Sequence, residues 1–167
     1  LARAHQSAIW SRPRQANSLR SPLREFYPAA LEAFGTDLTS SDALAVLAVA
    51  PTPELGRGLS RSKIAAALRR GGRQRKIDEH AERIQGALRS EQLAAPARIA
   101  EAYGVVTRST VTVIKGLNRE IAVLEEALGE GFDEHPDAKI IRSLPGLGTI
   151  LGARVLGEFG DVGRALA

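Results

Sequence analysis

The sequence predicts a mainly α-helical protein, and three observations support this fold class. Only 4% of the 167 residues are aromatic, so the core is expected to consist of Ala, Leu, Val and Ile. Apolar residues recur at spacings of three and four along most of the chain, which is the period of an α-helix. Ser before several of these stretches, and Gly or Pro after them, mark helix starts and stops. The length allows one modest domain or two small ones.

Residues 1–34 form an amphipathic pattern in which arginines separate the apolar positions. Pro13 and Pro22 interrupt this pattern. An interior proline removes a hydrogen bond and costs a helix about 3 kcal/mol, so kinks or breaks are expected at both positions. After Tyr27, a short apolar helix that ends at Gly35 is predicted.

Residues 36–76 are expected to contain a pair of short helices. Ser40 or Ser41 is the predicted N-cap of the first, and the second lies between Ser60 as N-cap and Gly71 at its end. The segment PTPELGRG between the helices is predicted to be a loop. The pair could form a DNA-reading helix-turn-helix, but this loop exceeds the usual tight turn, which favours a packing role.

Residues 77–130 are expected to form a helical connector. One helix is predicted from Ile77 to about Ser90, and a longer one from Pro96 to about Leu128. The rear half of the longer helix has aliphatic residues at spacings of three and four, the heptad seam of a coiled coil. This seam predicts a homo-oligomer, and packing within one chain is the alternative. Its residues are Ile114, Leu117, Ile121, Leu124 and Leu128.

The segment IRSLPGLGTILGARVLGEFG follows a predicted loop and a helix with Pro136 near its first turn. A Pro and two Gly within four residues should end a helix, yet helical spacing resumes directly afterwards. Two short helices joined by such a motif are typical of a helix-hairpin-helix, and a plain turn between helices is the alternative. The hairpin residues are Leu144, Pro145, Gly146, Leu147 and Gly148, followed by Thr149.

This hairpin is predicted to contact the DNA backbone. Pro145 fixes the exit from the first helix, and the two glycines reach backbone angles that are closed to other residues. Without side chains in the way, amides at the start of the second helix can donate to a phosphate. Leu147 is expected to point inward and hold the hairpin together. Many such hairpins have Lys or Arg where Thr149 stands, so Arg142 is the nearby cation.

The charge distribution also indicates a polyanionic partner. Residues 1–76 carry 13 Lys and Arg against 5 Asp and Glu, whereas residues 77–167 carry 10 against 14. Such a basic front half favours nucleic-acid binding, although 19 of the 23 cations are Arg, which a GC-rich genome would also produce. A basic stripe for phosphate contacts is predicted on the first helix, with a merely solvated face as the alternative. Its residues are Arg12, Arg14, Arg20 and Arg24.

Several classes of site are not expected. The chain has no Cys, which excludes disulfides and thiolate metal sites. Acidic residues cluster at predicted helix starts, where they suit the helix dipole, and the three histidines lack metal-ligand spacing. Neither a nucleophile elbow nor a P-loop is present. The sequence therefore predicts no catalytic residue, metal or cofactor in this chain. Its longest apolar run has eight residues and no signal peptide is evident, so a cytoplasmic protein is expected.

The segment SLPGLGTILGARVLGEFGD resembles the start of the C-terminal domain of the IS110 family of insertion-sequence transposases. The helical approach HPDAKIIRSLPGLG and the Leu-rich helix before it are similar to the same family. Residues 1–73 resemble the segment that follows the RuvC-like domain of that family, so the resemblance covers essentially the full chain.

This resemblance implies DNA transposition by a larger protein. In that family a RuvC-like domain supplies four acidic residues that bind Mg²⁺, a C-terminal domain supplies a nucleophilic Ser, and a structured RNA guides the reaction. Both catalytic sets would lie outside residues 1–167, so a DNA-binding fragment without its own catalytic residues is expected. The implied parts are the tail of the RuvC-like domain (1–35), the helix pair (36–76), the connector (77–130) and the truncated start of the C-terminal domain (131–167).

Two other functions remain open on the sequence alone. The chain could be a complete helix-hairpin-helix accessory protein of DNA repair or recombination. It could also be a helical protein-interaction module without a nucleic-acid role.

The hairpin hypothesis predicts the effect of replacing both of its glycines. Gly146→Val with Gly148→Val should weaken duplex DNA binding, because side chains would cover the amides. Helix content, measured by circular dichroism, should stay nearly unchanged. Fluorescence anisotropy with labelled duplex measures the affinity, and an unchanged affinity would reject the hairpin as a phosphate site.

Overall fold

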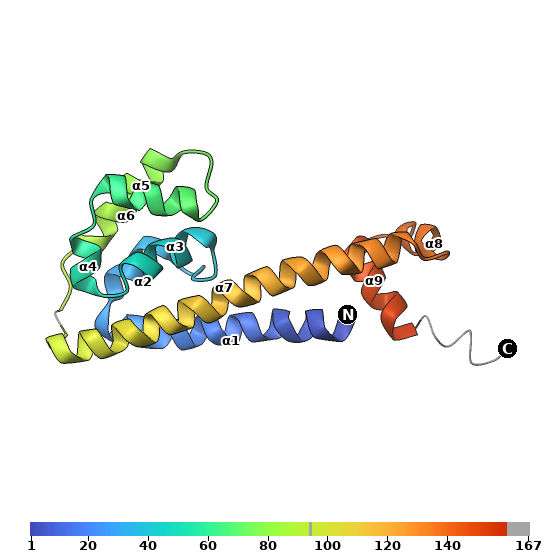
Figure 1. Cartoon of the computed structure of the whole chain (residues 1–167), viewed down its shortest axis with the longest axis horizontal. Coiled ribbons are helices and arrows are strands. Elements are labelled where there is room, and N and C mark those ends of the chain that lie inside the picture. Colours follow the sequence, from blue (N-terminus) through green and yellow to red (C-terminus); the bar gives the residue numbers. More distant parts are fainter. Residues whose placement is uncertain (94, 160–167) are drawn as a thin grey trace. The chain divides into compact units, whose positions relative to one another are not determined.

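The computed structural model describes residues 1–93 and 95–159, and within these ranges it contains helices and no strand (Figure 1). The predicted mainly α fold class is confirmed. No helix in the described ranges is long and apolar enough to cross a bilayer. The helices are α1 (Ala2–Phe26), α2 (Pro28–Phe34), α3 (Ser41–Val49), α4 (Pro53–Arg57), α5 (Arg61–Arg70), α6 (Ile77–Leu88), α7 (Ala97–Asp133), α8 (Ala138–Arg142) and α9 (Thr149–Phe159).

The chain divides into two compact units. The core unit comprises residues 12–116, and the end unit comprises residues 1–11 together with 117–167. Helices α1 and α7 each contribute to both units. The boundaries expected after residues 35 and 76 fall inside the core unit, and residues 160–167 of the last predicted segment lie outside the described residues.

Local capping defines the short helices of the core unit. The hydroxyl of Ser40 accepts a hydrogen bond from the amide of Ala43, and Ser60 caps α5 in the same way. Each of these bonds satisfies an amide that the helix itself leaves without a partner. The predicted N-caps Ser40 and Ser60 are therefore confirmed, as is the helix between Tyr27 and Gly35.

The segment predicted as a loop after α3 contains the short helix α4, so that prediction was wrong. Thr52 caps α4 through its hydroxyl, and Pro53 occupies its first turn, where the missing amide hydrogen costs nothing. At the end of α5, the left-handed residue is Gly72 with φ of 96°, whereas Gly71 has φ of −75° and stays in the helical region. The helix therefore ends at Gly71 as predicted, and only the left-handed residue expected at Gly71 lies one position later, at Gly72.

Helix α1 runs without a break through Pro13 and Pro22, contrary to the predicted interruptions. The physical reason lies in its packing. Leu19, Leu23 and Phe26 are fully buried in the core unit, and burial of each such side chain contributes about 1.5–3 kcal/mol. The sum outweighs the hydrogen bonds lost at the prolines.

An aliphatic core joins α1 to the rest of the core unit, as the low aromatic content predicted. Three aromatic residues, Phe26, Tyr27 and Tyr103, meet at one place, where the ring of Phe26 stacks on that of Tyr103 from α7 with centroids 5.2 Å apart. The hydroxyl of Tyr27 is buried there without a hydrogen-bond partner among the described residues, and burial raises the pKa of this phenol.

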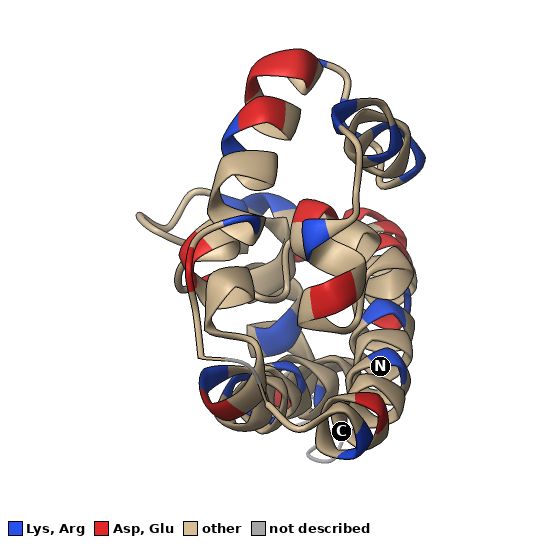
Figure 2. Cartoon of the chain, turned by 90° about the vertical axis from the view of Figure 1, so that its left-hand side faces the viewer, with Lys and Arg blue, Asp and Glu red and all other residues tan. Residues whose placement is uncertain are grey.

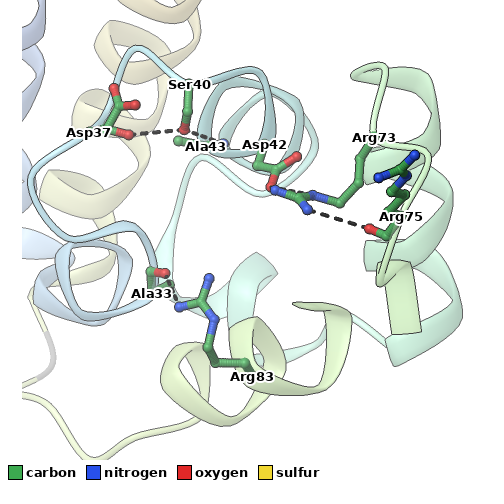
Figure 3. A network of polar contacts seen from close by, with 8 residues as sticks. All are labelled: Ala33, Asp37, Ser40, Asp42, Ala43, Arg73, Arg75 and Arg83. Carbon is green, nitrogen blue, oxygen red and sulfur yellow. Dashed lines mark hydrogen bonds and ion pairs between the residues drawn. The ribbon is translucent and has the colours of Figure 1, made fainter. Parts of the chain in front are cut away.

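Polar contacts fix the connection between α5 and α6 (Figure 3). Nε of Arg73 donates to Oδ2 of Asp42 at 2.7 Å, and its guanidinium also reaches the carbonyl of Arg75. The hydrogen bond to Asp42 raises the pKa of Arg73 above its ordinary value. On α6, Arg83 donates to the carbonyl of Ala33 at 2.8 Å. These bonds tie α6 and the preceding connection to α2 and α3.

The end unit has a small core of its own. Helix α7 extends to Asp133, beyond the predicted end near Leu128, and its Phe132 is buried against α8 and α9. Gly152 on α9 faces this ring, because a Cβ there would come within 2.7 Å of Phe132. Pro136 was predicted to lie in the first turn of α8. It lies before the N-cap Asp137 instead.

The close approach of Gly56 and Tyr27 gives a test of core packing. A Cβ at Gly56 would lie 1.7 Å from the hydroxyl oxygen of Tyr27. Gly56→Ala should therefore lower the free energy of unfolding by about 1–3 kcal/mol, measured by urea denaturation. Adding Tyr27→Phe should restore part of this loss, since the removed hydroxyl has no partner among the described residues.

Gly86→Ala is the matched control for this prediction. Gly86 lies inside α6 with open space where a Cβ would be, so alanine there should stabilise by up to about 1 kcal/mol. Equal effects of Gly56→Ala and Gly86→Ala would contradict the packing argument.

Candidate nucleic-acid interface

The most basic part of the chain is residues 57–76, which carry eight Lys and Arg and no Asp or Glu. They cover the end of α4, all of α5 and the connection to α6. Figure 2 shows this charge on α5, with acidic residues at the start of α6. This segment was not predicted as a site from the sequence, although a count of charges along the chain would have found it.

Some of these cations are neutralised by nearby acids. Arg61 lies 3.3 Å from Glu82, and Lys76 lies 3.6 Å from Glu79; Arg73 is paired with Asp42, as described above. The remaining cations are exposed and form no ion pair with an acid in the described ranges. These are Arg57, Lys63, Arg69, Arg70 and Arg75.

Two of the unpaired cations line one hollow. Lys63 and Arg70 lie two turns apart on α5 and share the wall of an open hollow of about 670 Å³. Val49 and Leu55 from α3 and α4 provide apolar surface beside them, and Glu54 of α4 adds one acid to the same hollow. The other side of α5 consists of aliphatic residues that are buried in the core unit. Because that side faces the core, Lys63 and Arg70 face solvent.

The arginines of the predicted basic stripe all lie on α1, and the stripe itself stays a prediction. Successive helical residues are turned by about 100°, which places Arg14 on roughly the opposite side of the helix from Arg12. Arg20 donates to the carbonyl of Thr36, so its guanidinium is partly engaged within the core unit. Arg14 and Arg24 are exposed, and Arg12 is half-buried. Arg20 and Arg24 are one turn apart and share a side of the helix, whereas Arg14 is turned away from Arg12.

The glycine elbow, defined as residues 143–148 between α8 and α9, lies at the surface of the end unit. Gly146 has φ of 81°, the left-handed conformation that the sequence predicted a glycine would supply. Both Gly146 and Gly148 are exposed. The amides of Thr149 and Ile150 form no hydrogen bond with any described residue, whereas that of Gly152 donates to the carbonyl of Gly148 at 2.8 Å. The elbow is therefore open, with unpaired amides at the start of α9.

Other parts of the predicted hairpin differ from expectation. Helix α8 has only five residues, much shorter than the first helix that the pattern predicted. Arg142 is paired with Asp133 and lies over the ring of Phe132 at 5.2 Å, so its charge is partly neutralised within the chain. Gly148 has open space around a Cβ and no positive φ, which makes Gly148→Val a cleaner substitution than Gly146→Val.

The predicted dimerisation seam is largely covered by the chain itself. Ile114 is buried in the core unit, and Ile121 and Leu124 are buried against Ala8 of α1 in the end unit. Leu128 is buried near α8 and α9, and Leu117 is half-buried. These contacts correspond to the alternative of packing within one chain, and the homo-oligomer stays a prediction.

A different face of α7 is open to solvent within the core unit. Ile99, Val106 and Val113 follow one another at heptad spacing and are each nearly half exposed. Ala102 and Ser109 lie between them and are also exposed. This solvent face is defined by these five residues, none of which is charged, and it lies on the opposite side of α7 from the buried Thr107, Val111 and Ile114.

The acidic residues occupy structural positions. Glu79 and Glu82 pair with cations of the basic segment, and Asp133 pairs with Arg142. Within the described ranges, no three His, Asp or Glu side chains come close enough to hold a metal ion.

The chain is similar to part of a transposase. Over 164 residues it is 41% identical to a protein of Streptomyces coelicolor named as a mini-circle transposase for IS117. The match covers 96% of this chain and 40% of that protein. No family model matches the chain, and no solved structure matches it either. The similarity supports the relationship to transposases that the sequence motifs indicated, and it covers both units of the structure.

Proposed function

We propose that this chain is a nucleic-acid-binding part of a transposase and acts in the transposition of an insertion sequence. One observation supports binding above the others: residues 57–76 place eight cations and no acid on one stretch of the core unit. Five of these cations are exposed and unpaired with described acids, so phosphates can neutralise them with release of counterions. The similarity to a protein named as a transposase indicates DNA as the polyanion.

The proposed binding surface on α5 is suited to contacts with the sugar-phosphate backbone of DNA. Lys63 and Arg70 are long cations beside a largely apolar wall that also contains Glu54, and Nε of Arg70 donates to the carbonyl of Ala66 on the same helix. Contacts with the backbone position a duplex without reading its sequence. The amides of Thr149 and Ile150 at the start of α9, which have no partner among the described residues, are a second proposed phosphate contact. A structured guide RNA offers the same phosphate chemistry and is also proposed as a partner.

In this proposal, other parts of the intact transposase cleave the DNA strands. The chain spans 40% of the length of the relative it matches. In the IS110-like proposal the Mg²⁺-binding acids and the catalytic Ser lie outside residues 1–167. Residues 1–167 contribute binding and scaffolding in this proposal.

Charge reversal on α5 tests the proposal. Lys63→Glu with Arg70→Glu should lower the affinity for a 20-bp duplex by about tenfold or more at low salt, measured by fluorescence anisotropy. The slope of log K against log salt should become flatter by about 0.9 for each phosphate that the variant no longer neutralises. Both side chains are exposed, so the circular dichroism spectrum should not change.

Arg89→Glu with Arg98→Glu is the matched control for this experiment. Both residues are exposed, belong to the core unit and give the same change in net charge. An equal loss of affinity in the two double variants would show a response to net charge alone and would reject the α5 surface as the binding site. Wild-type protein that fails to bind duplex at about 50 mM salt would reject the DNA-binding function.

Self-association through the solvent face of α7 is a second part of the proposal. Val and Ile at heptad spacing, with small residues between them, match the a and d positions of a two-stranded coiled coil. No residue of this face is charged, and contiguous exposed apolar surface can mark an interaction site. The seam predicted from the sequence is less suited to self-association, since four of its five residues are buried within the chain.

Val106→Glu with Val113→Glu should therefore produce a monomer, whereas the wild type should form a dimer whose population rises with concentration. The reason is that two like charges would face each other across the paired helices. Sedimentation equilibrium over a concentration series measures the mass, and Leu93→Glu, at a residue that is 92% exposed outside this face, is the control. A wild-type monomer at all concentrations would contradict the proposal.

A further inference from the structure

The end unit has an open groove beside the glycine elbow. Its volume is about 500 Å³, and it lies between the first turns of α1 and one side of α9. Apolar side chains form much of its wall: Trp10, Leu147, Leu151 and Val155. The side chain of Leu147, which was expected from the sequence to hold the hairpin together, faces this groove and is half-buried.

Trp10 is the unusual member of this wall. It is the only Trp in the chain and is 61% exposed, although an indole gains more than most side chains from burial. Leu151 across the groove is also 48% exposed. An exposed indole with aliphatic surface beside it provides a flat apolar platform of the size of a nucleobase.

The polar residues of the groove suit a nucleotide better than an apolar peptide. Arg3 and Arg154 contribute positive charge at its rim, against the single acid Glu158, which lies 3.9 Å from Arg3. Gln6 and Ser7 add amide and hydroxyl groups that can donate to or accept from a base edge. The carboxamide oxygen of Gln6 is itself buried without a hydrogen-bond partner among the described residues, so it is not one of the groups open to a base.

We propose that this groove binds an unpaired base of single-stranded DNA, stacked on the indole of Trp10, with the adjoining phosphates at Arg3 and Arg154. Aromatic platforms combined with cations are the usual means of holding single strands, because every base has a π-face. In a duplex the faces of the bases are covered by their neighbours, so this site requires an unpaired nucleotide. The choice of DNA rests on the proposed function.

Intrinsic fluorescence tests this site directly, because Trp10 is the only indole in the chain. Titration of the full chain with oligodeoxythymidylate should quench its emission in a saturable way. A duplex of the same length should bind the basic surface of the core unit with little quenching. Oligouridylate is the RNA probe, and stronger quenching by it than by the deoxy strand would overturn the assignment to DNA.

Substitutions separate stacking from apolar contact. Trp10→Phe should keep most of the affinity for the labelled deoxy strand, whereas Trp10→Leu should lower it by about tenfold, measured by anisotropy. Leu151→Glu should also weaken this binding, by placing an acid in the groove. Val123→Glu is the control, at another exposed apolar residue of the end unit outside the groove.

The outcomes distinguish this inference from the proposed function. Absence of quenching by the deoxy strand, or equal affinities of Trp10→Leu and wild type, would overturn the base-binding site. Neither result would contradict the proposed duplex binding, since the affinity for a duplex depends on Lys63 and Arg70. Conversely, loss of duplex binding only in the α5 variant, with quenching retained, would show that the two sites are independent.

Discussion

The burial of one face of α1 is the constraint on which the core unit depends. Leu19, Leu23 and Phe26 are fully buried, and Phe26 stacks on Tyr103 of α7. This packing keeps α1 helical through two prolines, each of which would break an isolated helix. With α1 and α7 held together inside the unit, α2 to α6 have an apolar surface on which five short helices can pack. None of these helices is long enough to be stable by itself.

The basic surface follows from that packing. The aliphatic side of α5 is required by the core, with Ile64 and Leu68 fully buried. Lys63 and Arg70 must therefore face solvent, because the same helix cannot bury both sets of residues. The ion pair of Arg73 with Asp42 fixes the connection after α5, and Arg61 and Lys76 lie beside acids of α6. The five cations of this segment without an acid partner among the described residues remain available to a polyanion.

The end unit combines a closely packed side with an open one. Gly152 lets α9 approach the ring of Phe132, which positions the helix without covering its first turn. The elbow and the groove beside Trp10 are therefore both exposed. In the proposed transposase part, the core unit would hold the duplex backbone and the end unit an unpaired base.

The sequence by itself determined the helical fold class, the caps Ser40 and Ser60 and the left-handed glycine of the elbow, because these depend on residues close together in the chain. Even the charge of residues 57–76 was present in the sequence, but the fold was needed to show which cations lack an acid partner. Tertiary structure alone decided that α1 continues through its prolines and that Arg142 pairs with Asp133. It also decided which apolar face of α7 is buried. Helical spacing identifies two such faces equally well, and only contacts with distant segments distinguish them.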